Sequence, residues 1–520
     1  MCGIFGIISP HKQISNADLS FLAKHAEQRG KDSSGLFVGK LDCHELHRAN
    51  KSITLLLKDI GELTAGFVIG HSRLITNGLM DNQPVYRDDV CVIHNGIVVN
   101  HNNLWEQIGK TPNQKIDTEI IAAITAEHLA AGGSVDGIAG RVLDLCKGVV
   151  ACAVALPKLG KLVLFSNNGS LYYGTKQDSH YFSSESYPIK RLNCKDVTQV
   201  RSQCLVIEIP AKSCAPIIHE NGQSLLNLIP NLGTQKTEEG MLEYAENNLK
   251  RCTRCILPET MPFIRFDDRG VCNYCRSHKT RNKPKPIEDL IQLVEPYRRS
   301  HEEDCIVPFS GGRDSCYALH LITKELKMKP ITYTYDWGMV TDLGRRNISR
   351  MSSALGVENI IVADNLSLKR RNISMNFKAW LKSPNLGMVS ILTAGDKHFF
   401  RHVETIKQQT GIPLNLWGVN PLEVTHFKAG FLGVPPDFAE ERVYSHGALK
   451  QLRYQWLRLK AMSQSIGYFN SSLWDTLSGE YYRSFNKKTH YYHIFDYTKL
   501  YLYLRRLAFG IKHSQLSSAR

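Results

Sequence analysis

An apolar run that leads into a glycine-containing turn and then into a helical pattern restricts the fold of the second half of this chain. Residues 305–309 (Cys-Ile-Val-Pro-Phe) predict a buried strand, which continues directly into Ser310-Gly311-Gly312-Arg313-Asp314-Ser315. Apolar residues then recur at helical spacing, at Cys316, Leu319, Ile322 and Leu326. The N–H groups at a helix start bind anions, and two glycines let an oxyanion approach the backbone closely. The pattern therefore predicts an α/β domain with an anion-binding turn.

The next apolar segment extends this prediction. Residues 331–336 (Ile-Thr-Tyr-Thr-Tyr-Asp) predict a second strand parallel to the first. Ligands of open α/β sheets bind at the carboxyl ends of the strands. Asp336, at that end, is therefore a candidate ligand-binding residue.

Two Cys-x-x-Cys pairs precede this domain. Cys252 and Cys255 are separated by sixteen residues from Cys272 and Cys275, and the intervening segment 267–270 (Asp-Asp-Arg-Gly) predicts a tight turn. Four thiolates with this spacing can surround Zn²⁺ as a closed tetrahedron, which makes the metal structural. Redox-active cysteine pairs are the alternative interpretation.

The start of the chain suggests a nucleophile. Cys2 follows Met1 directly, so removal of Met1 would place a thiol and a free α-amine on one residue. An amine beside a thiolate can serve as its general base. The alternative is a small buried residue in an edge strand. The catalytic interpretation depends on the removal of Met1.

Three later segments favour the catalytic interpretation. They are Arg29-Gly30-Lys31-Asp32-Ser33-Ser34-Gly35, then His71-Ser72-Arg73 with Thr76-Asn77-Gly78, and then His94-Asn95-Gly96-Ile97 with Asp117-Thr118-Glu119. Together with Cys2 they resemble the class II glutamine amidotransferase domain of the N-terminal nucleophile superfamily, over roughly the first 210 residues. This sequence differs from the family at Lys31, where the family usually has Pro.

This resemblance implies an α+β domain of four layers (αββα) and a role for each site residue. Cys2 would attack the side-chain amide of glutamine, and Asn95 with Gly96 would form the oxyanion hole. Arg73 would hold the α-carboxylate and Asp117 the α-amine, with Thr76 beside them in the glutamine site. Taken singly, these residues could also be a turn and surface ion pairs.

A second resemblance covers roughly residues 250–430. The turn at 310–315 resembles the PP-loop of the adenine-nucleotide α-hydrolase fold, as in asparagine and GMP synthetases, with Arg313 where many relatives have Lys. Preceded by the cysteine pairs, by Leu257-Pro258-Glu259-Thr260 and by the segment 266–272, it resembles the N-acetyl sugar amidotransferases of surface-polysaccharide biosynthesis. The resemblance implies that ATP adenylates an acceptor oxygen and that ammonia displaces AMP. Residues 310–315 would hold the pyrophosphate, with Arg313 offsetting its charge and Asp314 contacting Mg²⁺.

The length of 520 residues exceeds what one hydrophobic core usually supports. We predict a glutaminase domain at 1–215, a linker at 216–245, a four-cysteine zinc ribbon at 246–285 and a PP-loop domain at 286–520 that begins with a helix at Ile287. The segments 395–399 and 417–423 follow strand-like runs and have the composition of ligand loops. Asn420 and Glu423 are therefore the candidate acceptor-binding residues.

Charge is distributed unevenly along the chain. Residues 1–240 hold 23 basic and 23 acidic side chains, so the whole net charge of +15 lies after residue 240. Such a region suits polyanionic ligands, among them a nucleotide triphosphate, a sugar nucleotide, nucleic acid or an anionic membrane surface. The segment from Arg483 to the end has eight Lys or Arg and one Asp, and its aromatic residues suit either contact with anionic lipid or packing on the domain core.

The resemblances together predict a glutamine-hydrolysing, ATP-dependent enzyme with Mg²⁺ and structural Zn²⁺. Its acceptor would be an N-acetyl sugar, nucleotide-linked in the favoured version, and its product an acetamidino sugar for lipopolysaccharide, O-antigen or capsule. Two alternatives stay open: amidation of a carboxylate, either of a uronic acid or of aspartate, and modification of tRNA by a PP-loop enzyme.

The favoured hypothesis has no nucleic-acid partner and leaves the oligomeric state open. We find no signal peptide and no apolar run of membrane-spanning length, and fourteen Cys in so long a chain do not resemble a secreted disulfide framework. We therefore expect a cytoplasmic enzyme, with peripheral contact at the inner membrane surface through the C-terminal tail as an addition.

Overall fold

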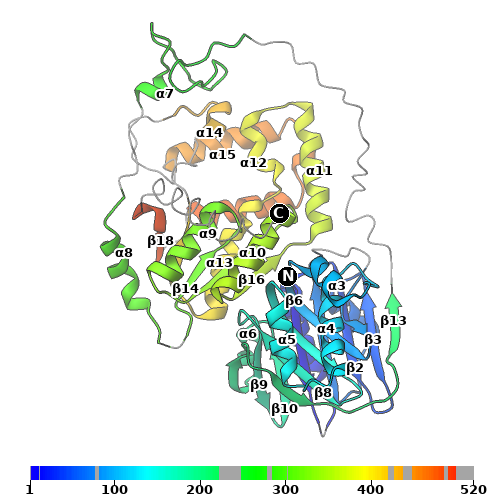
Figure 1. Cartoon of the computed structure of the whole chain (residues 1–520). Helices are drawn as coiled ribbons and strands as arrows, with labels where there is room; N and C mark the ends of the chain where they lie inside the picture. Colours follow the sequence, from blue (N-terminus) through cyan, green and yellow to red (C-terminus); the bar gives the residue numbers. More distant parts are fainter. Residues whose placement is uncertain are drawn as a thin grey trace. The chain divides into compact units, whose positions relative to one another are not determined.

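The computed structural model describes residues 2–10, 12–75, 81–221, 248–277, 284–300, 302–419, 427–436, 448–484 and 490–498. They fall into two compact units. Figure 1 draws the helices and strands of the whole chain. The first unit contains residues 1–231, 299–368 and 402–413, and the second contains residues 232–298, 369–401 and 414–520.

Two β-sheets form the larger part of the first unit. The eight-stranded sheet has the order β11-β9-β10-β1-β4-β2-β3-β13, and the five-stranded sheet has the order β12-β8-β7-β6-β5. The strands are β1 Gly3–Ile8, β2 Ser33–Gly39, β3 His44–Ala49, β4 Phe67–Arg73, β5 Val85–Arg87, β6 Val90–Val98, β7 Gly148–Leu156, β8 Lys161–Ser166, β9 Tyr172–Lys176, β10 Ser179–Ser183, β11 Lys195–Gln199, β12 Leu205–Glu208 and β13 Ile217–Asn221.

Helices cover the outer face of each sheet. Along β1, Ile4 and Ile8 pack between the two sheets, whereas Phe5 and Ile7 pack against helices, as the alternation of side chains along a strand requires. The helices are α1 Asn16–Ala26, α2 Ile53–Ile60, α3 His101–Ile108, α4 Thr118–Ala130, α5 Gly137–Leu145 and α6 Ser186–Arg191. Apolar residues of α1 and α2 face the eight-stranded sheet, and those of α3, α4 and α5 face the five-stranded sheet. The order of layers is the predicted αββα arrangement.

Three parallel strands complete the first unit. They are β14 Cys305–Pro308, β15 Pro330–Asp336 and β16 Asn359–Ala363, and β15 pairs with both of the others. Helix α9 Arg313–His320 follows β14, and helix α10 Asp342–Leu355 connects β15 to β16. The predicted passage from strand through turn into helix at residues 305–320 and the predicted second strand are both confirmed.

The second unit is mainly helical within its described residues. Its helices are α7 Asn273–Arg276, α8 Ile287–Val294, most of α11 Leu366–Lys382, α12 Val389–Leu392, α14 Phe427–Phe431, α15 Ala448–Met462 and α16 Ser472–Ser484. Strands β17 Asn415–Trp417 and β18 Tyr491–His493 pair in parallel, and α13 Phe399–Thr410 begins in this unit. We expected a strand before Gly395, but the apolar run there forms α12, so this prediction was wrong. Met388 and Ile391 of this run pack into a helical core.

The expected linker at 216–245 begins with a strand. Residues 217–221 form β13, which pairs in parallel with β3, and Glu220 forms an ion pair with Arg48 at 2.6 Å. Residues 222–247 lie outside the described part of the chain. Among the described residues, no helix is both long and apolar enough to span a bilayer.

Candidate active site

Cys2 lies where three strands meet. It precedes β1, whose first residue Gly3 pairs with Ser72 on β4, and its backbone N–H donates to Asn95 Oδ1 on β6 at 3.0 Å. Its Sγ is 3.8 Å from the carbonyl oxygen of Leu74, and the residue is buried. The fold therefore brings the predicted nucleophile and the predicted oxyanion residue together from positions 93 apart.

Arg73 is the last residue of β4 and is buried. Burial lowers the pKa of its guanidinium, while the nearby Cys2, Asp117 and Asp32 act in the opposite direction. The guanidinium also donates to the carbonyl oxygen of Asp81. The electrostatic influence of Cys2 and Asp117 on Arg73 places the three predicted residues in one cluster.

Asp117 precedes α4 and turns toward β6. Its Oδ2 accepts the backbone N–H of Val98 at 2.7 Å, so one carboxylate oxygen is fixed. Beside it, His94 Nε2 lies 3.1 Å from the carbonyl oxygen of Val149. Burial lowers the pKa of His94, although the charge of Asp117 opposes the shift. His94 is thus a buried neighbour of the cluster.

The two residues predicted to form the oxyanion hole, Asn95 and Gly96, have different local contacts. The side-chain oxygen of Asn95 is occupied by the N–H of Cys2, and its Nδ2 has no hydrogen-bond partner among the described residues. Gly96 lies so close to β7 that a Cβ would collide with the carbonyl oxygen of Val149. Only glycine fits there, because any side chain would push β6 away from β7.

A serine from the second half of the chain completes this part of the site. Ser349 on α10 accepts the N–H of Val149 at 2.7 Å and donates to the carbonyl oxygen of Ile97 at 2.9 Å. Ile97 and Val149 are register partners on β6 and β7. The hydroxyl therefore bridges the two strands one residue beyond Gly96, which sequence analysis did not foresee.

Asp32 is a second residue to which sequence analysis gave no role. Its Oδ2 accepts the N–H of Ile75 at 2.9 Å, and its own N–H donates to the carbonyl oxygen of Arg73 at 3.0 Å. Burial raises the pKa of Asp32, Arg73 lowers it, and the charge of Asp336 adds to the rise. The only sequence signal for Asp32 was its position within the segment Arg29–Gly35.

The turn between β14 and α9 joins the strand to the helix where the sequence predicted an anion-binding turn. Gly311 has φ +71°, and a Cβ there would strike the carbonyl oxygen of Gly344 on α10. Ser310 Oγ and Ser315 Oγ lie 3.2 Å apart, and Ser315 Oγ donates to Gly312 O at 3.0 Å. The remaining predicted residues are Arg313, which is exposed, and Asp314, which is half-buried. The structure thus brings all six predicted residues of the turn together.

Asp336 ends β15, as predicted, but its carboxylate is already engaged. Its Oδ2 accepts Arg345 at 2.9 Å, and its Oδ1 accepts the N–H of Gly338 at 2.9 Å. Arg345 belongs to α10, so this helix contacts Asp336, Gly311 and the pair Ile97 and Val149. One helix therefore contacts both the turn 310–315 and the strands β6 and β7.

The four predicted cysteine ligands form one cluster in the second unit. Their sulfur atoms all lie within 4.8 Å of one another, with Cys252 to Cys275 at 3.9 Å and Cys255 to Cys272 at 3.6 Å. Burial would raise the pKa of Cys252, but backbone N–H groups, first that of Cys272, lower it to about 6. The predicted turn is present, since Arg269 N and Val271 N both donate to Asp267 Oδ1.

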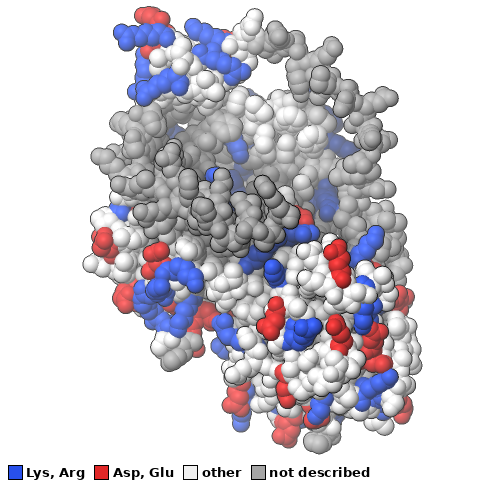
Figure 2. Space-filling view, in the orientation of Figure 1, with Lys and Arg blue, Asp and Glu red and all other residues white. Residues whose placement is uncertain are grey.

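Cations gather around this cysteine cluster. Figure 2 shows Lys and Arg side chains over the segment that carries α7. The exposed basic residues of segment 248–277 are Lys250, Arg251, Arg254, Arg265, Arg269 and Arg276. The segment therefore contributes to the positive charge of the chain after residue 240.

Three predicted site residues lie outside the described part of the chain: Thr76, Asn420 and Glu423. Near the other expected ligand loop, a cluster that sequence analysis missed is present. Asp475 on α16 contacts Lys369 Nζ at 2.9 Å and His398 Nδ1 at 3.0 Å, and Lys369 Nζ also donates to Ala394 O. No local motif indicates this cluster, because its members are far apart in sequence.

Comparison with known proteins identifies the first part of the chain. The profile of one family, described as "Glutamine amidotransferase domain", matches residues 71–191. Glutamine–fructose-6-phosphate aminotransferases from Mesorhizobium japonicum and Escherichia coli K12 are 31% and 29% identical over 179 and 196 residues. These matches cover 32% and 36% of this chain but only 29% and 32% of the relatives.

Among solved structures, an allosteric regulatory enzyme of purine biosynthesis aligns with 70% of this chain and 80% of its own, at 15% identity and a TM-score of 0.35. The matches to the family profile and to the two aminotransferases show a class II glutamine amidotransferase domain in the first part of this chain.

Proposed function

We propose that the chain is a glutamine- and ATP-dependent amidotransferase. Ammonia released from glutamine at Cys2 would pass to an adenylated N-acetyl sugar, giving an acetamidino sugar for surface polysaccharide. The observation that carries the proposal is that the Cys2 cluster and the turn 310–315 belong to one compact unit and share contacts with α10. Release of ammonia and activation of an acceptor would then occur within one compact unit.

The chemistry at Cys2 follows from its neighbours. After removal of Met1, the free α-amine would take the thiol proton, and the thiolate would attack the side-chain amide of glutamine. The N–H of Gly96 and the Nδ2 of Asn95 would stabilise the oxyanion, and ammonia would leave. The buried guanidinium of Arg73 suits the α-carboxylate, and the second oxygen of Asp117 suits the α-amine.

The path between the two sites would be short. The charge of Asp336, at the carboxyl end of β15, affects the titration of Asp32, which contacts the backbone of Arg73. Interactions between charges weaken with distance, which supports a short separation of the two carboxylates. We propose that ammonia passes between the glutamine site and the acceptor site without entering bulk water.

The turn 310–315 would bind the pyrophosphate of ATP. Its glycines expose backbone N–H groups at the start of α9, and Arg313 can swing toward a polyphosphate because its side chain is largely exposed. Asp314 would contact Mg²⁺, which offsets the phosphate charge. The adenylate supplies a leaving group that an amide or carboxylate oxygen lacks.

The cysteine cluster fits structural zinc. A tetrahedral ion with bonds of about 2.3 Å to sulfur would separate the sulfur atoms by about 3.8 Å. The two sulfur pairs of this cluster lie 3.6 Å and 3.9 Å apart. Cys252, Cys255, Cys272 and Cys275 would hold the ion and leave it no open position for catalysis.

The proposal also specifies the chemical class of the acceptor. Support comes from the resemblance to N-acetyl sugar amidotransferases and from relatives whose names pair glutamine with fructose 6-phosphate. We place Asn420 and Glu423 at the acceptor, which would be nucleotide-linked. We place the enzyme in the cytoplasm, where its C-terminal segment would contact the inner membrane surface that carries glycan synthesis.

A coupled assay tests the proposal. The protein is incubated with glutamine, Mg-ATP and UDP-linked diacetamido sugars or uronic acids, while glutamate, AMP and acceptor mass are followed together. We expect AMP release and a loss of about 1 Da from the acceptor, since nitrogen replaces oxygen. Cys2→Ala should abolish the reaction with glutamine and retain it with ammonium, and Cys43→Ala, outside the site, is the matched control.

Three results would contradict the proposal. A mature N-terminus that retains Met1 would exclude the catalytic role of Cys2. A product in which a carboxylate has become an amide would favour the uronic acid or aspartate alternative. AMP release only with added tRNA, and without glutamate, would favour tRNA modification.

A further inference from the structure

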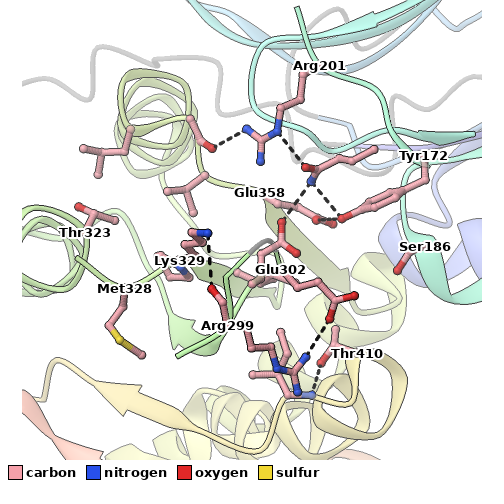
Figure 3. A pocket seen from close by; sticks show the side chains of 18 of the residues that line it. Tyr172, Ser186, Arg201, Arg299, Glu302, Thr323, Met328, Lys329, Glu358 and Thr410 are labelled. Carbon is pink, nitrogen blue, oxygen red and sulfur yellow. Dashed lines mark hydrogen bonds and ion pairs between the residues drawn. The ribbon is translucent and has the colours of Figure 1, made fainter. Parts of the chain in front are cut away.

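A cavity of about 560 Å³ lies in the first unit, and neither Cys2 nor the turn 310–315 lines it (Figure 3). Its walls come mainly from two distant parts of the sequence, to which Thr410 and Ile412 are added. The glutaminase domain contributes residues 172–201, including Tyr172 and Arg201, and the parallel-sheet segments contribute residues 299–358, including Glu303 and Glu358. A ligand in this cavity would therefore touch both parts.

The cavity lies at the opposite edge of the parallel sheet from the turn 310–315. Pro330 at the start of β15 and Glu358 just before β16 line it, whereas the turn follows the carboxyl end of β14. The seven residues of β15 make a strand roughly 23 Å long. The cavity is thus separate from the site that we assign to ATP.

The lining carries more cations than anions. Its basic residues are Lys190, Arg201, Arg299, Lys324 and Lys329, and its acidic residues are Glu302, Glu303 and Glu358. Lys190 and Lys324 are exposed and form no ion pair with any described residue. Unpaired cations on a concave surface attract an anionic ligand.

One of the three carboxyls contributes no charge near neutral pH. Glu358 is buried and accepts Tyr172 Oη at 2.6 Å. Burial, together with the nearby charge of Glu303, raises the pKa of Glu358 to about 8. At pH 7 the cavity therefore presents five cations and two carboxylates.

Hydrogen bonds hold the floor of the cavity in place, as the dashed lines of Figure 3 show. Gln199 Nε2 donates to Tyr172 Oη at 3.0 Å and to Glu303 Oε1 at 3.3 Å. Arg201 donates to Gln199 Oε1 at 2.9 Å and to the carbonyl oxygen of Gly356 at 3.3 Å. Both halves of the cavity are thus joined by a polar network before any ligand binds.

We propose that this cavity binds a phosphorylated small molecule of sugar-phosphate or nucleotide size. The volume falls within the usual range for small-ligand pockets, about 300–1,000 Å³. Arginine and lysine side chains are the ordinary partners of phosphate, and the apolar wall at Met328 and Ile331 would accept a sugar or base face. The ligand would bridge the glutaminase domain and the parallel sheet, and so stabilise their contact.

Direct binding to the full-length chain tests this site without glutamine or enzyme turnover, so a failed amidotransferase assay would not affect the result. The probes are glucose 6-phosphate, AMP and, as the uncharged control, glucose, followed by titration calorimetry. The double variant K190E/K324E reverses two exposed charges of the cavity. K24E/K58E reverses two exposed lysines of α1 and α2 and is the matched control.

We expect at least one phosphorylated probe to bind the wild type and K24E/K58E, and K190E/K324E to bind it at least about tenfold more weakly. If glucose 6-phosphate binds, the ligand is a sugar phosphate. If AMP binds and K190E/K324E weakens its binding, the ligand is a nucleotide. Hydrogen exchange should slow in segments 186–201 and 355–358 when the probe is added.

Two outcomes would overturn the proposal. One is that neither phosphorylated probe binds at about 1 mM, a concentration that detects even weak sites. The other is that K190E/K324E binds the probe as tightly as the wild type, because the ligand is then held elsewhere, for example at the turn 310–315.

Discussion

The oxygen and the nitrogen of the Asn95 side-chain amide have different roles. Its oxygen accepts the N–H of Cys2, and its Nδ2 is the atom that would face the oxyanion of the substrate. Asn95→Asp keeps the acceptor and removes the donor. We expect kcat for glutamine hydrolysis to fall by about 10²–10³-fold while KM changes little, because the loss is confined to the transition state.

The control for this variant is Asn103→Asp, an exposed position on α3 that should leave the kinetics unchanged. Full activity of Asn95→Asp, measured as glutamate release, would show that the amide donor is not part of the oxyanion site.

Glu358 predicts a pH dependence of stability. Its pKa in the folded chain is raised to about 8, chiefly by burial, so the folded protein keeps a proton that the unfolded chain releases at lower pH. The free energy of unfolding should therefore fall as pH rises from about 5 to about 8. Glu358→Gln does not titrate, and the melting temperature of this variant should fall less between about pH 5.5 and about pH 8.5 than that of the wild type.

The difference between the two proteins is the measured quantity, since other groups titrate equally in both. Glu302→Gln, an exposed residue of the same cavity, should melt like the wild type at each pH. Parallel curves for wild type and Glu358→Gln would contradict the raised pKa.

Helix α10 contacts strands β6 and β7 through the hydroxyl of Ser349. Ser349→Ala would leave the N–H of Val149 and the carbonyl oxygen of Ile97 without this buried partner. We expect a loss of about 1–3 kcal/mol in the free energy of unfolding, and lower glutaminase activity because Gly96 is adjacent. Urea unfolding and glutamate release measure the two effects.

Ser353 on the same helix is a matched control, because its hydroxyl accepts the half-buried Asn167 at 3.0 Å. Ser353→Ala should lose less stability and retain glutaminase activity. Equal behaviour of the two alanine variants would mean that α10 does not position strand β6.

The turn before α9 depends on its first glycine. Gly311→Ala would force a side chain into a left-handed conformation and against the carbonyl oxygen of Gly344. We expect this variant to lose AMP release while glutamine hydrolysis at Cys2 persists. Gly344→Ala, where a Cβ has its nearest contact at 3.3 Å, should retain both activities.

The cysteine cluster predicts a metal requirement for the chain as a whole. We expect about one zinc per purified chain, and a lower melting temperature after treatment with a chelator, because binding of the ion contributes to folding. Cys255→Ser should remove the metal, whereas Cys214→Ser, an exposed cysteine outside the cluster, should not. A chain that is free of zinc and equally stable would contradict the structural site.

Patterns formed by residues close in sequence predicted much of this fold. The strand, turn and helix at 305–320, the cysteine spacing and the start of α8 at Ile287 all depend on residues close in sequence. The short apolar run at α12 has no such signature, since four residues fit a strand or a helix equally well. Ser349 and the cavity of Glu358 depend on contacts between residues far apart, which no local pattern reports.

The hydroxyl of Ser349 also has a consequence for the order of synthesis. Val149 and Ser349 are 200 positions apart. A ribosome that adds roughly 5–20 residues per second makes the serine about 10–40 s after its strand partner. During that interval the nascent glutaminase domain lacks the bridge beside its oxyanion glycine. The contacts around Gly96 are therefore complete only after Ser349 has been synthesised.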